Sequence, residues 1–287
     1  MPLTLNTNLN SLNAQRNLSS SQSSLAMSMQ RLSSGLRVNS AKDDAAGLAI
    51  AERMTAQVRG MNVSIRNAND GISMAQTAEG TLGKVTDSLQ RMRELSVQAA
   101  NATNSDSDKN SMDKEFGELA KEIQRVLGGT SFNGQHMLGV DAKAFTFQVG
   151  ANTTSNDTIA ITTTDMTTDA TITAVAGTDN TGAGRALIDS TANATTIQGV
   201  VDNIDTAIST VNDQRAVMGA SQSRFDSVIT NLQNSVENQT AARSRIMDTD
   251  FAAETSNLSR AQILQQAGNA IVAQANQLPQ QVLTLLR

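Results

Sequence analysis

The side chains that most often carry enzyme chemistry are scarce in this sequence. His136 is the only histidine, and it follows the turn-forming pair Asn133-Gly134. This context predicts a surface residue beside a turn, not a catalytic base. A zinc peptidase helix of the His-Glu-x-x-His type needs two histidines on one face, so this chain cannot form one.

Acidic and glycine-rich segments offer no better starting point for catalysis. Asp43-Asp44 and the segment 106–108 lack the spaced oxygen ligands of a calcium loop, so we interpret them as solvated charges or helix-start residues. The glycines at 80–83 and 128–129 are not followed by the Lys-Ser or Lys-Thr of a phosphate-binding loop. The sequence also has no cysteine. We therefore expect no catalytic residue, no metal and no cofactor, and hence no enzyme.

Composition argues against a nucleic-acid or membrane partner. The formal net charge is −5, and no basic stripe with interleaved aromatic residues is present. No stretch reaches the roughly 18 apolar residues that a membrane-spanning helix needs. Residues 1–8 lack the basic and apolar regions of a secretory signal peptide, which alone predicts a cytoplasmic protein unless another export route exists. Because Trp and Tyr are absent, aliphatic residues must fill the interior, as suits helix–helix seams.

A heptad pattern in the N-terminal half predicts one very long helix. Apolar residues follow alternating steps of four and three from Met54 to Ala75, and after one extra step of three they continue from Ala78 to Ala99. The extra step predicts local overwinding of a coiled coil. A helix of about 55 residues would be roughly 80 Å long at about 1.5 Å per residue.

Two further helices should pack against the long one. Residues 197–236 keep one register of threes and fours, in which Arg215 and Gln222 take two of the slots. This predicts pairing with most of the 54–99 helix. Between them, the stripe from Met112 to Val126 predicts a shorter helix that ends at the glycines 128–129.

The pattern changes around residues 130–195. Phe145 and Phe147 alternate with polar residues, which predicts a strand, and 158–162 is another β-like run. We interpret this region as hairpins and loops attached to the helices. Residues 165–190 contribute to no heptad seam, so we expect a deletion there to be tolerated. The Thr-rich span 152–181 is either a site for O-linked sugars or an unmodified loop.

Both chain ends carry apolar stripes with very little charge. The N-terminal stripe consists of Leu18, Leu25, Met29 and Leu32. The C-terminal stripe consists of Leu264, Ile271, Leu278, Val282 and Leu285, inside an uncharged segment 261–286. Such helices are marginal alone in water, so we expect them to pack in the core of a larger assembly and to order fully only there. The alternative, a pair of frayed tails, fits less well because disordered tails usually carry charge.

Several blocks of this sequence resemble bacterial flagellins, the subunits of the flagellar filament. The blocks are Gln30–Gly47, Ser64–Ser73, Leu89–Asn101, Ala242–Ile246, Ser259–Gly268 and Ala275–Arg287. They stand in the family's order and at its distances from each terminus. Only residues 153–196 separate the strand region from the last helices, so the chain resembles a short flagellin without large outer domains.

The resemblance implies a mainly α fold with a terminal α-helical coiled coil and a rod-shaped bundle of long helices bearing a small β-hairpin region. It implies a discontinuous core domain of residues 1–45 and 244–287, and a rod domain of residues 46–243 with a hairpin and loop insertion around 130–195. It also implies polymerisation into the filament that propels swimming, after secretion through the flagellar type III export channel. The expected partners are other copies, an export chaperone, and the cap and hook–filament junction proteins.

One further surface follows from the resemblance. Arg91 and Leu95 are four residues apart, off the main seam, and Glu115 lies off its own helix stripe. We expect the three to face outward together. In the family the matching positions help subunits stack, and in many members Toll-like receptor 5 of vertebrates recognises them, so we expect recognition here too.

The main rival interpretation is a hook–filament junction protein, whose chain ends are similar. We would not expect such a protein to carry the full 89–101 and 275–287 blocks. Growth of long polymers on filament seeds would favour the filament subunit, whereas capped ends would favour the junction protein.

Overall fold

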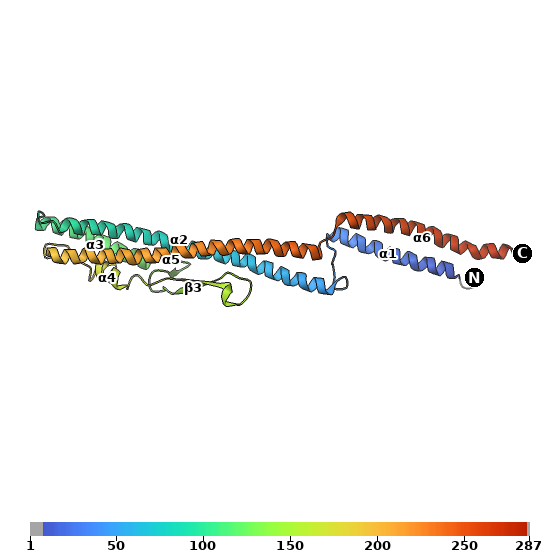
Figure 1. The fold of residues 1–287 in the computed structure, drawn as a ribbon, viewed down its shortest axis with the longest axis horizontal. Helices are drawn as coiled ribbons and strands as arrows, with labels where there is room; N and C mark the ends of the chain where they lie inside the picture. The colour runs from blue at the N-terminus through green and yellow to red at the C-terminus, as the bar shows by residue number, and fades with distance from the viewer. Residues whose placement is uncertain (1–7, 286–287) are drawn as a thin grey trace. The chain divides into compact units, whose positions relative to one another are not determined.

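The computed structural model describes the backbone of residues 8–285 and the side chains of residues 8–277. Contacts divide the chain into two compact units: a terminal unit, formed by the residues up to Val58 and from Glu237 onward, and a central unit, Arg59–Val236. Helices dominate (Figure 1), and they are α1 (Leu9–Ser34), α2 (Ala45–Ala99), α3 (Asp106–Gly129), α4 (Ala170–Ala176), α5 (Ala194–Met247) and α6 (Phe251–Leu285). The predicted fold class, paired terminal helices and a long-helix bundle with a small hairpin region, is confirmed.

The two long helices α2 and α5 pair through the central unit, as predicted, and they run antiparallel. Arg93 Nε donates to Asp205 Oδ1 at 2.6 Å, and farther along Gln222 Nε2 donates to Glu79 Oε2 at 2.8 Å. The ring of Phe225 occupies the space beside Gly71, where an added Cβ would lie 2.7 Å from Phe225 Cζ. The glycine therefore lets the two helices and a large ring pack at one level.

The third helix of the central unit ends where the sequence predicted, but it begins at Asp106, about one and a half turns before the apolar stripe that starts at Met112. Its start is a capping box, in which Ser105 Oγ accepts from Asp108 N–H while the Asp108 carboxylate accepts from Ser105 N–H. Its end is Gly129. Buried residues on α3 extend beyond the predicted stripe and are Met112, Asp113, Phe116, Gly117, Ala120, Ile123, Gln124 and Leu127.

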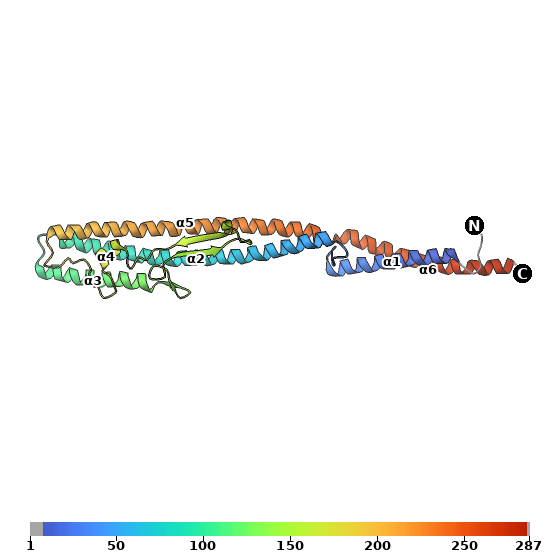
Figure 2. The same cartoon turned by 90° about the horizontal axis from the view of Figure 1, so that it is seen from below.

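Two antiparallel hairpins follow α3. In the first, β1 (Ser131–Phe132) and β2 (Gln135–His136) are joined by Asn133 and Gly134, which both have positive φ, as a two-residue type I′ turn requires. In the second, β3 (Ala144–Gln148) pairs with β4 (Thr158–Thr162) after a short 3-10 turn, η1 (Ser155–Asp157). Figure 2 shows the second hairpin lying along the long helices. The predicted strands are therefore confirmed.

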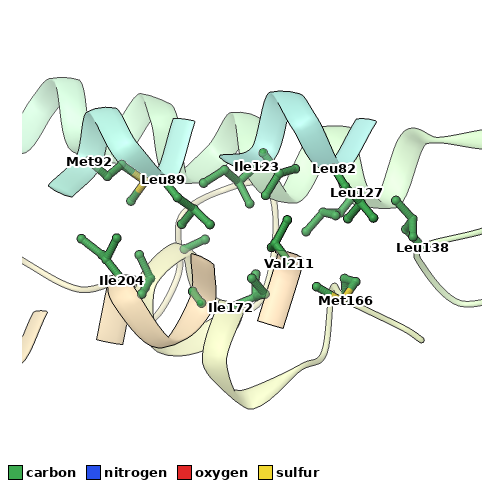
Figure 3. Close-up of a cluster of buried hydrophobic side chains, with 14 of the residues drawn as sticks. Leu82, Leu89, Met92, Ile123, Leu127, Leu138, Met166, Ile172, Ile204 and Val211 are labelled. Carbon is green, nitrogen blue, oxygen red and sulfur yellow. The ribbon is translucent and has the colours of Figure 1, made fainter. Parts of the chain in front are cut away.

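The segment after β4 differs from the prediction. Residues 163–192, which we call the strap, include α4 and contribute six apolar residues buried in the core: Met166, Ile172, Val175, Ala176, Ile188 and Ala192. Figure 3 shows Met166 and Ile172 facing side chains of α2, α3 and α5. The expectation that 165–190 is a dispensable loop is therefore wrong. A short apolar run that fills a gap between long helices has no heptad of its own, so helical periodicity does not reveal it.

A buried ion pair holds the strap against α3. Arg185 Nη1 lies 2.9 Å from Asp113 Oδ1, and the N–H of Ile188 donates to the same oxygen at 3.0 Å. The Arg185 guanidinium also covers the ring of Phe116, 6.0 Å from its centroid. Farther along α3, Gln124 Nε2 donates to the carbonyl of Gly177. Polar residues on the buried face of α3 thus fix the course of the strap.

Asp-x-Thr turns give the strap its local structure. In each turn the aspartate Oδ1 accepts from both the N–H and the hydroxyl of the threonine two residues later. The pairs are Asp165–Thr167, Asp169–Thr171, Asp179–Thr181 and Asp189–Thr191. A composition rich in Thr and Asp therefore orders this segment without long helices or strands.

Candidate functional site: an outward-facing helix pair and an ion cluster

The terminal helices α1 and α6 pack side by side as an antiparallel pair (Figure 1). Asn8 Nδ2, just before α1, donates to the carbonyl of Ala275 at 2.7 Å. Leu18 fills the space beside Gly268, where an added Cβ would be 3.2 Å from Leu18 Cδ1. The sum of the paired residue numbers stays nearly constant, as antiparallel pairing requires.

Small residues line the seam of this pair. On α1 the buried residues are Ser11, Ala14 and Ser28, and on α6 they include Ala261 and Ala275. The leucines at 18, 25 and 32 are half-buried and recur every seven residues between the small ones. The small side chains let the two helices approach closely, but they bury little apolar area. The pair is therefore held by a narrow seam.

Large apolar residues of α1 and α6 point away from the seam. Leu9 and Ile263 are each 65% exposed. Apart from Phe251 at the start of α6, the exposed large apolar residues of these helices are Leu9, Leu12, Met27, Met29, Ile263, Leu264 and Ile271, which we call the outward set. Met29, Leu264 and Ile271 belong to the apolar stripes of the sequence, but within one chain they lie outside the seam, where Ser28, Ala261 and Gly268 take the seam slots. The side chains of Leu278, Val282 and Leu285 lie outside the described residues.

Sequence analysis did not identify four members of the outward set: Leu9, Leu12, Met27 and Ile263. The signal that could have found them is the pair pattern itself. If the seam is assigned to the small residues at heptad spacing, the large apolar residues left over must lie on other faces.

The connectors next to these helices are also paired with each other. Leu36 forms an isolated antiparallel bridge with Asp248, and the N–H of Arg37 donates to Met247 O at 2.6 Å. Asp43 Oδ2 accepts hydrogen bonds from the hydroxyl and the N–H of Ser40, which lower the pKa of Asp43 below its ordinary value. These contacts fix the start of the helix pair, so both helices leave the connectors together.

A cluster of exposed charges lies on the central unit where α2 meets α3. Arg91 Nε donates to Glu115 Oε1 at 2.8 Å, and Arg91 Nη1 donates to Glu94 Oε2 at 2.9 Å. Leu95 is not part of this exposed surface: it is 2% exposed and belongs to the core. The expectation of an outward Leu95 is therefore wrong, because α3 packs on α2 and turns this second face into core. Arg91 and Glu115 do meet on one face.

His136, the only histidine, makes a hydrogen bond through its backbone N–H. The N–H of His136 donates to Asp141 Oδ2 at 2.9 Å, while its Nδ1 is shielded from solvent and has no hydrogen-bond partner. Among the side chains of residues 8–277, no three metal-ligating groups gather in one place. Within the part of the backbone that is described, no helix is long and apolar enough to cross a membrane.

These features define a class of protein: a structural helical subunit whose two chain ends pair and present unfilled apolar faces. A family model described as the bacterial flagellin N-terminal helical region matches residues 5–141, and one described as the bacterial flagellin C-terminal helical region matches residues 201–286. The flagellin of Halalkalibacterium halodurans is 44% identical over 283 residues, 99% of each chain. The flagellin of Xenorhabdus nematophila is 44% identical over the full length of both chains. The chain belongs to the bacterial flagellin family.

Two solved structures are also similar to this chain. The crystal structure of Bacillus cereus flagellin is 32% identical and covers 62% of this chain and 94% of that one, with a TM-score of 0.48. A putative flagellar hook-associated protein from Vibrio parahaemolyticus has a TM-score of 0.60 at 14% identity, covering 72% of this chain and all of that one, and shows a shared fold alone. As a family member, the chain is a self-assembling structural subunit of the flagellar filament.

Proposed function

We propose that copies of this chain polymerise by covering one another's outward-facing apolar residues on α1 and α6, and that the polymer propels swimming. The observation that carries this proposal is the distribution of small and large apolar residues on these helices. Small residues fill the seam within one chain, while the large apolar residues remain in water. Burial of apolar surface is favourable by about 25 cal/mol per Å², so neighbouring copies that cover these residues would drive assembly.

Seeded growth tests this proposal. Purified subunit carrying Leu264→Gln and Ile271→Gln would be mixed with short filament fragments, and elongation followed by light scattering and electron microscopy. We expect elongation to stop while the central unit keeps its helical circular dichroism. The matched variant Leu264→Met with Ile271→Met keeps the apolar area and should still elongate. Normal growth of the glutamine variant would contradict the proposal, and capped ends that never grow would favour a junction protein.

We also propose that the chain leaves the cell through the flagellar type III export channel, with help from an export chaperone, and meets the cap and hook–filament junction proteins outside. Family membership supports this route. The test compares cells with and without a functional flagellar export gate. The chain should be found in the medium and on filaments only when the gate functions, and secretion without the gate would contradict the proposal.

A second candidate function is recognition by Toll-like receptor 5. The supporting observation is that Arg91 and Glu115, from different helices, meet on one exposed face. With Leu95 in the core, we assign the contact to the two charged residues and give Leu95 the role of holding α2 in place. Arg91→Ala with Glu115→Ala should abolish receptor signalling by the free subunit.

The matched control is another exposed ion pair that joins two helices of the central unit, between Arg93 and Asp205. Its side chains are 46% and 48% exposed, close to the 48% of both Arg91 and Glu115. Arg93→Ala with Asp205→Ala should signal as the wild type does. Equal loss of signalling in both double variants would show a general effect of lost ion pairs and would contradict the assignment.

A further inference from the structure

We propose that Met27 and Met29 of α1 form an oxidant-sensitive modification site, and that conversion of their thioethers to sulfoxides prevents the subunit from assembling. The inference rests on the proposed function, because it requires that α1 is covered by neighbouring copies. It adds a chemical control on that surface, with a peroxide as the reactant.

The two methionines are distinguished by their exposure. Met27 is 47% exposed and Met29 is 57% exposed. Met54 is half-buried. The other methionines with described side chains are at most 8% exposed, and they are Met61, Met74, Met92, Met112, Met137, Met166, Met218 and Met247. A peroxide in solution therefore reaches the thioethers of α1 well before those of the core.

No other type of side chain in this sequence competes well with methionine for a mild oxidant. The sequence contains no cysteine, tryptophan or tyrosine. Methionine thioethers are then the most easily oxidised side chains present. Selective exposure of two of them on one helix concentrates the reaction there.

The surroundings of Met27 show why a sulfoxide would matter. Met27 and Leu264 lie on a groove of about 370 Å³ between α1 and α6, which is also lined by Ser24 and Arg260. Most residues that line this groove are polar, and Met27 is one of three apolar ones, with Ala261 and Leu264. Met29 is also turned away from the seam, among the outward residues of α1.

The chemistry is a two-electron oxidation with hydrogen peroxide as the oxidant. The sulfur lone pair attacks one peroxide oxygen, the O–O bond breaks, and an S–O bond forms. The sulfur is oxidised, the peroxide is reduced, and water leaves. The product is a polar, chiral sulfoxide in place of a flexible apolar side chain, which disfavours burial in an interface.

Peptide mapping gives the first test. Trypsin cleaves after Arg16 and Arg31, so one peptide, residues 17–31, contains Met27 and Met29 and no other methionine. After brief treatment of the free subunit with hydrogen peroxide, this peptide should gain oxygen before the peptides that carry core methionines. In filaments treated in the same way, the peptide should be protected. Equal oxidation of core and α1 methionines in the free subunit would overturn the proposal.

Seeded elongation gives the second test. Peroxide-treated subunit should elongate seeds about tenfold more slowly or worse, which corresponds to at least about 1.4 kcal/mol. Methionine sulfoxide reductases with dithiothreitol should restore growth. The variant Met27→Leu with Met29→Leu should lose no activity on treatment, whereas Met54→Leu should remain as sensitive as the wild type. Each protein is compared with its own untreated sample, so that changes in basal rate cancel.

The outcomes separate this inference from the proposed function. If untreated subunit elongates seeds but oxidation of the 17–31 peptide leaves the rate unchanged, the redox inference is wrong and the assembly proposal stands. If the peptide is oxidised as fast in filaments as in the free subunit, α1 is not covered there and both proposals fail.

Discussion

At the scale of single residues, Asp113 and Arg185 form the least exposed ion pair of the central unit. The two side chains are only 12% and 16% exposed. Burial opposes ionisation of Asp113, but hydrogen bonds from Arg185 and Ile188 N–H, together with the arginine charge, outweigh it and hold the pKa of Asp113 below its ordinary value. A depressed carboxyl pKa stabilises the folded state at neutral pH and stops doing so in acid.

We predict that Asp113→Ala lowers the free energy of unfolding at pH 7 by about 3–5 kcal/mol, because it leaves the Arg185 charge buried and unpaired. In the wild type, the contribution of Asp113 is complete above the unfolded pKa of about 3.9 and is lost as the pH falls toward the lower folded pKa. The variant should therefore show a weaker loss of stability between about pH 5 and pH 2.

Urea unfolding followed by circular dichroism at several pH values measures both effects. Asp205→Ala is the control, since its partner Arg93 is half exposed and its loss should change stability little. An Asp113 variant with wild-type stability at pH 7 would show that the strap does not depend on this pair.

Two glycines of α2 should respond in opposite ways to the same substitution. Gly71→Ala places a Cβ 2.7 Å from Phe225 Cζ and should destabilise the central unit by about 1–3 kcal/mol. Gly80→Ala meets nothing within 4 Å and should stabilise it by about 0.5–1 kcal/mol, because alanine is the better helix former. Thermal unfolding of the two variants compares them directly, and a shared sign would contradict the packing described for Phe225.

At the scale of elements, the strap is a structural layer of the central unit. We predict that removal of residues 165–190 unfolds this unit, since it deletes five buried apolar residues and the Arg185 contact. Each large buried side chain contributes about 2–5 kcal/mol, and a domain has only about 5–15 kcal/mol in total.

A matched insertion separates length from packing. A short Gly-Ser insertion between Asn180 and Thr181 opens only the exposed Asp179–Thr181 turn and leaves the buried residues of the strap in place. It should be tolerated, because each doubling of loop length costs about 0.6 kcal/mol. Circular dichroism and dye binding to exposed apolar surface would report both variants. A deletion variant that still folds would show that the central unit does not need the strap, and would contradict the prediction.

At the scale of the whole molecule, the two units depend on different sources of stability. The central unit has a continuous apolar core shared by α2, α3, α5, the β3–β4 hairpin and the strap. The terminal unit has only a small cluster around Val38, Ala51 and Met247, besides the narrow seam of α1 and α6. Helices with so little burial are marginal in water, so this unit should gain most of its stability from neighbouring copies.

We predict that removal of residues 278–287 yields a soluble subunit that keeps its central unit but forms no filaments. The deletion removes Leu278, Val282 and Leu285 and leaves the central core intact. Hydrogen exchange should show slow amides in the central unit of both proteins, and fast amides across residues 9–34 and 251–277 in the free subunit. Filaments from the truncated chain, or loss of slow amides in its central unit, would contradict this division of roles.

The sequence by itself determined the long helices, the pairing of the 54–99 and 197–236 segments, the end of α3 and the turn at Asn133-Gly134. These features depend on local chemistry and on periodicity, so residues close together in the sequence are enough to predict them. The end blocks also sufficed to identify the family, because they are long and ordered.

Only the tertiary structure decided which apolar residues are core and which are surface. Leu95 was predicted to face outward but is buried, because α3 covers that face of α2. Leu264 and Ile271 lie on an apolar stripe of the sequence, and only the structure shows that they are exposed in the single chain, because small residues fill the seam and let the helices approach closely. The strap was read as a loop, although it closes the core. The physical reason is the same in each case. Whether a side chain is buried depends on what packs against its segment, and the periodicity of that segment does not identify the packing partner.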